Sequence, residues 1–151
     1  MAFDGIAFGK VPRTGGLHLK AVRASTADRA QTIPPLAASA LAWAVPGAGH
    51  LLLGRRQKGL VFLVALSAMF LIGLGLSGRL FPFVVAEPLV MLAALATRGI
   101  GVPALLAGWL GAGHGVVTAA SYEYGNAFLI VSGLLNLLVA LDAYDVALGR
   151  K

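Results

Sequence analysis

The chain has 151 residues, of which 58% are hydrophobic and only 12% are charged. A soluble domain carries about 25% charged residues. The low charge content and the mean hydropathy of +0.85 therefore indicate that lipid is the solvent for much of this chain. The net charge of +6 comes from cations scattered beside apolar runs, without interleaved aromatic residues, which argues against nucleic acid as a partner and for topology signals beside lipid headgroups. Cysteine is absent, which excludes disulfides, thiol nucleophiles and thiolate metal sites.

Residues 1–33 form a separate, glycine-rich and basic zone. No long apolar stretch follows the first residues, so the segment does not resemble a cleavable signal peptide. Its cations outnumber its acids: Lys10, Arg13, Lys20, Arg23 and Arg29 stand against Asp4 and Asp28. We expect a solvated cytoplasmic tail, followed by a helical transmembrane domain over residues 34–151. A segment that lies on the membrane surface or docks on a partner is the alternative.

The first apolar run extends from Leu36 to Leu53 and contains helix-breaking residues. As a continuous helix its 18 residues would reach about 27 Å, which is barely a bilayer core. Pro46 and Gly47 lie beyond its middle, where proline removes a backbone hydrogen bond and glycine weakens the helix. The pattern predicts a broken or re-entrant segment.

Four further apolar runs follow, separated by short polar or glycine-rich stretches. They cover Leu60–Ser77, Phe83–Thr97, Val102–Ala120 and Ala127–Leu148. We expect Leu60–Ser77 to be a full span, and we read the other three runs as crossing segments as well. The expected fold is therefore an all-α integral membrane protein with about four transmembrane helices plus the broken first segment.

The distribution of cations favours one topology. If the first run is re-entrant, with both ends on the cytoplasmic side, and the other four runs cross the membrane, eleven of the twelve cations are cytoplasmic and only Arg79 is outside. If the first run crosses and runs three and four fuse, Arg98 lies mid-membrane at a cost of about 2.5–3.5 kcal/mol or more. Five spans with the N-terminus outside fit the charges least. The sequence thus predicts a bacterial cytoplasmic membrane protein with both termini in the cytoplasm.

The sequence "GAGH" occurs twice and places His50 and His114 beside small residues. Two imidazoles could ligate a haem or chlorophyll, with small neighbours that admit the flat ring. Both histidines also lie near the ends of apolar runs, where an imidazole can reach water or headgroups. No His-x-x-x-His or Glu-x-x-His pair occurs. We therefore expect neither a metal nor another cofactor, and keep the paired ligands as an alternative.

Small residues indicate helix packing in two places, because they let helix backbones approach closely. Gly111 and Gly115 form one small-xxx-small step. The last run carries a stripe of small residues at helical spacing: Gly133, Asn136, Ala140, Ala143 and Ala147. Asn136 is expected to donate a hydrogen bond across an interface.

Two carboxylates, Asp142 and Asp145, share one face of the last run. No nucleophile accompanies them at a recognisable spacing, so an ion-paired cluster is a better interpretation than catalysis. Its other predicted members are His50, Arg55 and Arg56, with Arg150 and Lys151 as rival partners. Glu87, directly before Pro88, marks a helix start and is the other candidate for a functional buried charge.

The stretches "PGAGHLLLGRRQKG" and "NLLVALDAYD" resemble the TM2-domain group and related uncharacterised bacterial membrane families. The resemblance covers about a third of the chain. It implies that His50, Gly54, Arg55, Gly59 and Asp142 are motif positions. It also implies a small non-enzymatic membrane protein and supplies no substrate.

These observations predict an accessory, scaffold or assembly component that acts through helix–helix contacts. Its expected partners are membrane lipids and either other membrane subunits or further copies of this chain. The alternatives are an oligomeric transporter or channel-like protein and a cofactor-binding subunit. A lipid enzyme ranks last, because only His50, Arg55 and Asp142 support it.

Overall fold

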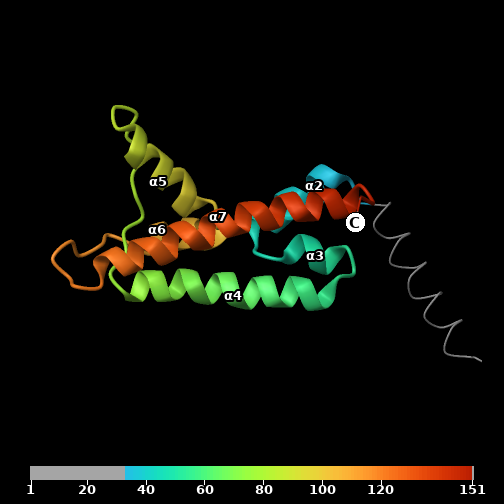
Figure 1. Cartoon of the computed structure of the whole chain (residues 1–151), viewed down its shortest axis with the longest axis horizontal. Coiled ribbons are helices and arrows are strands. Elements are labelled where there is room, and N and C mark those ends of the chain that lie inside the picture. The colour runs from blue at the N-terminus through green and yellow to red at the C-terminus, as the bar shows by residue number, and fades with distance from the viewer. Residues whose placement is uncertain (1–32, 151) are drawn as a thin grey trace, which may run out of the picture.

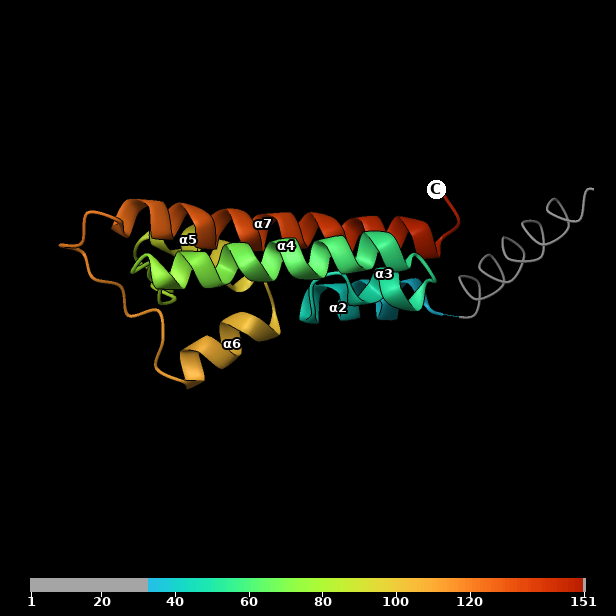
Figure 2. The same ribbon diagram turned by 90° about the horizontal axis from the view of Figure 1, so that it is seen from below.

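The computed structural model describes residues 33–150, and this part of the chain is all-helical. The helices are α2 (Pro35–Ala44), α3 (Ala48–Leu52), α4 (Arg56–Gly75), α5 (Pro88–Arg98), α6 (Val102–Trp109) and α7 (Tyr122–Ala147). The long helices α4 and α7 lie side by side and antiparallel, and the four short helices pack around them (Figures 1 and 2).

Two described helices are long and apolar enough to cross a membrane, α4 with 20 residues and α7 with 26. The pair α5–α6 passes the same test only as one segment, and it is bent by 106° at its break. The described chain therefore has two helices that could span a membrane, or three candidate spans if the bent pair is one span. The prediction of about four spans is wrong.

The two runs wrongly counted as separate spans are Phe83–Thr97 and Val102–Ala120. In each of them the helix is shorter than the apolar run. Helix α5 has 11 residues and α6 has 8. The chain turns at Gly101, whose φ of 81° is open mainly to glycine. Helix α6 then ends before Gly111 and Gly113, which also have positive φ. Glycine content, rather than hydropathy, set these boundaries.

The first apolar run is broken where the sequence predicts. Gly47, with a φ of 77°, separates α2 from α3. A side chain at Gly47 would collide with the backbone of Gly59 in α4, so this position needs glycine for space as well. The two helices form a hairpin, since Ile33 before α2 and Leu53 after α3 belong to one apolar cluster with Val146 near the end of α7.

Helices α5 and α6 form a second hairpin, which starts at the end of the molecule opposite the α2–α3 hairpin. Both hairpins start with a proline in the first turn, and in both a positive-φ glycine caps the second helix. The α2–α3 hairpin lies beside the C-terminal half of α7, and the α5–α6 hairpin lies beside its N-terminal half (Figures 1 and 2). Their tips meet, because a side chain at Gly101 would collide with the carbonyl of Trp43.

The small residues of α7 make these contacts possible. Ala140 and Ala143 pack in one apolar cluster with Ala38 and Ala42 of α2. A side chain at Gly133 would collide with the carbonyl of Ala96 in α5. The predicted stripe on the last helix is therefore a packing face. The small-xxx-small step predicted at Gly111 and Gly115 is not a helix-packing face, because both glycines lie in the loop after α6, with φ of 69° and 71°.

Candidate functional site

Asn136 of α7 joins the tips of the two hairpins. Its Nδ2 donates to the carbonyl of Trp43 in α2 and to that of Gly99 after α5, both at 2.9 Å. These carbonyls lie at helix C-termini, where the last acceptors have no partner within the helix. Asn136 is fully buried, and its Oδ1 has no partner among the described residues. The expected donation across an interface is confirmed, with two helix ends as its acceptors.

His50 and Asp142 form a pair closer to the C-terminal end of α7. The distance from His50 Nε2 to Asp142 Oδ2 is 2.9 Å. The His50 side chain is 0% exposed and that of Asp142 is 23% exposed. The imidazole also meets the ring of Phe62 in α4 edge to face, with 5.3 Å between centroids. His50 Nδ1 is buried and has no partner among the described residues.

The pair ties three elements together at this end of the molecule. His50 belongs to α3, which Gly47 turns back against α4. The backbone N–H of Arg55 donates to the carbonyl of His50 at 2.9 Å, so the start of α4 is linked to the same residue. Asp142 supplies the contact from α7. The structure thus brings His50, Arg55 and Asp142 together.

Asp145 makes a different contact from Asp142. It pairs with Arg150 at 3.5 Å, one of the two partners named as rivals. The Arg150 side chain is 68% exposed, so the pair is a surface contact. Arg55 and Arg56 line a separate recess of about 360 Å³ at the start of α4, together with Lys58.

His114 is exposed and lies in the loop after α6, where it forms an isolated β-bridge with Arg79. This loop and helix α3, which holds His50, are at opposite ends of the molecule (Figures 1 and 2). The two histidines therefore cannot ligate one haem or chlorophyll from both sides. No group of three or more histidine, aspartate or glutamate side chains that could hold a metal occurs within residues 33–150.

Arg98 does not share the end of the molecule that holds Arg55. Its Nη1 donates to the carbonyl of Phe81 at 2.6 Å, and its guanidinium lies 4.3 Å from the centre of the Phe83 ring. The loop of Phe81 and Phe83 follows α4, so it lies at the end where α4 finishes. The expectation that Arg98 joins the other cations is wrong, because it assumed that the third run crosses.

Glu87 occupies the position directly before α5, as the sequence predicts, with Pro88 in the first turn, and its side chain makes no capping hydrogen bond. Its side chain is exposed in the folded chain. Glu87 therefore marks a helix boundary and is not enclosed by the protein.

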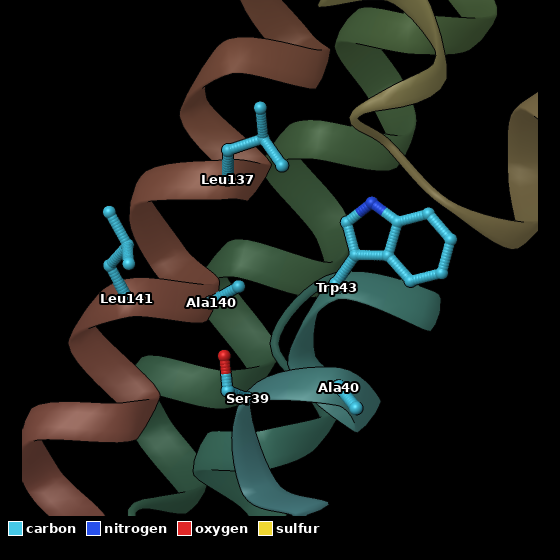
Figure 3. Close-up of a pocket in the computed structure, with 6 residues that line it drawn as sticks. All are labelled: Ser39, Ala40, Trp43, Leu137, Ala140 and Leu141. Carbon is cyan, nitrogen blue, oxygen red and sulfur yellow. The ribbon is translucent and has the colours of Figure 1, made fainter. Parts of the chain in front are cut away.

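An apolar groove of about 360 Å³ runs between α2 and α7 (Figure 3). Ser39 and Ala40 of α2 and Ala140 of α7 are its small lining residues. Trp43, Leu137 and Leu141 are its large ones, and the Trp43 side chain is 41% exposed. We refer to this feature as the α2–α7 groove.

Over residues 33–150, the fold and these contacts define an all-helical arrangement with two helices capable of spanning a membrane, or three candidate spans if the bent α5–α6 pair is one. The chain belongs to a family of unknown function, DUF6677, whose model matches residues 37–151. The match includes the first hairpin from the third residue of α2 onward, the whole second hairpin, Asn136 and the His50–Asp142 pair. No curated protein and no solved structure matches the chain.

Proposed function

We propose that this protein is an integral component of the bacterial cytoplasmic membrane that acts through helix–helix contacts, as an accessory, scaffold or assembly subunit. The α2–α7 groove is the observation that carries the proposal. Its small residues, Ser39, Ala40 and Ala140, would let the backbone of another transmembrane helix approach closely. Trp43 and Leu141 beside them offer apolar area to the same helix. A further copy of this chain or another membrane subunit would supply it.

The charge distribution supports an orientation with the C-terminus in the cytoplasm. Arg55, Arg56 and Lys58 precede or begin α4, at the end of the molecule where α7 finishes before Arg150. Arg79 lies at the opposite end, in the loop after α4. Cytoplasmic loops carry an excess of arginine and lysine. The end that holds Arg55 and Arg150 would therefore face the cytoplasm.

Filling the α2–α7 groove tests the subunit role. Ala40→Phe places a large ring among the lining residues, so a helix bound there would be displaced. After mild detergent extraction, this variant is expected to lose at least half of any stoichiometric membrane partner or homo-oligomer. The measurement is quantitative co-purification, with size-exclusion chromatography for the oligomer.

The matched control is Ala65→Phe, which adds the same ring at an exposed alanine of α4. It should keep the partner. A monomer without partners for the unchanged chain, or equal losses for both variants, would reject the groove as the contact surface.

A transporter or channel-like role is the second candidate. Two broken helical hairpins enter from opposite ends and meet at Asn136. Transporters place substrate sites where discontinuous helices end near the middle of the bilayer. His50 and Asp142 would then contribute polar groups on the path from the cytoplasmic end. Because two to three spans are few, such a protein would work as an oligomer.

Reconstitution into liposomes tests this second candidate. The chain should carry ion or small-solute flux above that of empty liposomes. Asp142→Asn should reduce the flux about tenfold, since the carboxylate beside His50 is lost, whereas Asp145→Asn at the surface pair should not. Flux that is absent, or equal in all three proteins, would count against transport.

A further inference from the structure

A recess of about 250 Å³ lies between α6 and the loops at the end of the molecule opposite Arg55. We call it the Arg98 recess. Arg98 and His114 supply its charged and polar side chains. Leu80, Ala104 and Leu105 supply an apolar wall. It therefore combines a cation, a hydrogen-bonding ring and apolar surface in one cavity.

Arg98 is held in place there but is not neutralised. The Phe81 carbonyl accepts a hydrogen bond from Nη1, and the Phe83 ring lies against the guanidinium. The carbonyl end of α5 also favours a cation at this position. Within residues 33–150, however, no carboxylate lies within ion-pair distance of Arg98. The other N–H groups of its guanidinium remain as donors for a ligand.

His114 is brought to the same recess by the glycine-rich loop after α6. The backbone N–H of Leu80 donates to the Gly113 carbonyl at 2.8 Å, and Arg79 bridges to His114, so two loops are joined here. Gly111 and Gly113 have positive φ, which lets the loop turn tightly. The imidazole Nε2 lies close to Gly111, and the His114 side chain is exposed at the wall of the recess.

We propose that the Arg98 recess binds a phosphate-type oxyanion. A half-buried arginine without a counter-anion is unfavourable in an apolar setting, and an anionic ligand would offset this. The planar fork of arginine matches two oxygens of a phosphate group, and an imidazole N–H can donate to a third. The oxyanion would be the headgroup of an anionic lipid, whose glycerol and chains would lie on the apolar wall, or free phosphate.

Binding to the detergent-purified full chain tests this site. The probes are short-chain phosphatidylglycerol, short-chain phosphatidylcholine and inorganic phosphate, and the readout is the shift in thermal unfolding with probe concentration. Phosphatidylglycerol should bind best if a lipid headgroup is the ligand, whereas inorganic phosphate should suffice if free phosphate is. Arg98→Gln should weaken the apparent affinity about tenfold or more, and His114→Gln about threefold to tenfold.

Arg79→Gln is the matched control, because Arg79 is an exposed arginine at the same end of the molecule, its side chain does not line the recess, and its bridge to His114 is made by backbone atoms that the substitution keeps. It should change the affinity less than twofold. His114→Gln keeps the test valid if Arg98→Gln unfolds, since the exposed His114 side chain is not part of the core. Equal losses of apparent affinity in the Arg79 and His114 variants would overturn the proposal, because they would indicate general attraction by charge. So would the absence of saturable binding of either anionic probe.

Discussion

Replacing Asn136 with leucine is expected to lower the free energy of unfolding by about 2–4 kcal/mol. Leucine has similar volume but no donor, so the carbonyls of Trp43 and Gly99 would both lose their hydrogen bond. Both are helix-end carbonyls at the buried junction of the hairpins, and hydrocarbon offers no water to replace the lost partner. The measurement is unfolding in detergent or mixed micelles, monitored by helical circular dichroism.

Ser132→Ala is the matched control for this variant. Ser132 is buried on the same helix, but its hydroxyl donates only to the carbonyl of Leu129, one turn earlier. Its loss should lower the free energy of unfolding by about 1 kcal/mol or less. If Asn136→Leu destabilises no more than Ser132→Ala, Asn136 does not hold the two hairpin tips together.

Replacing Asp142 with alanine is expected to destabilise the protein by about 2–4 kcal/mol. The change removes the carboxylate that His50 Nε2 contacts at 2.9 Å, and the imidazole remains fully buried. The Nδ1 atom already lacks a partner among the described residues, so the ring would lose the polar contact that Nε2 makes. The same unfolding measurement applies.

A double-mutant cycle separates the contact from the two side chains. His50→Ala and Asp142→Ala should each destabilise, and the double variant should lose less than their sum by about 1–3 kcal/mol. Asp145→Ala is the control, because its partner Arg150 is mostly exposed and such surface pairs contribute about 1 kcal/mol or less. Fully additive losses at positions 50 and 142 would show that the pair does not couple α3 to α7.

The sequence predicts the first hairpin and the contact of His50 with Asp142, because local chemistry determines them, whereas Asp145 pairs with Arg150. Pro46 and Gly47 cannot continue a helix through a run that is otherwise apolar. Asp142 near the end of an apolar helix needs a polar partner, and His50 is near the same end once the first run turns back. The donor role of Asn136 likewise follows from a polar side chain on a small-residue face.

The second hairpin could not be predicted from hydropathy. Runs three and four are apolar enough to be read as two spans, yet the turn at Gly101 joins them into one bent pair. The acceptors of Asn136, the carbonyls of Trp43 and Gly99, become neighbours only when both hairpins are in place. The Arg98 recess depends on the same turn, because Arg98 at the end of α5 and Ala104 of α6, on either side of Gly101, both line it.

Two hairpins that enter the membrane from opposite sides and meet at Asn136 would each keep both of their flanking segments on one side, which single-cysteine labelling measures. The natural chain has no cysteine, so Ala30→Cys, Gln57→Cys, Ala86→Cys and Thr118→Cys each introduce one reactive site. Position 30 precedes the described residues; positions 86 and 118 flank the second hairpin and are exposed. A membrane-impermeant maleimide should label positions 30 and 57 from the cytoplasmic side and positions 86 and 118 from the other side. Labelling of 30 and 57 from opposite sides, or of 86 and 118 from opposite sides, would contradict this arrangement of the hairpins.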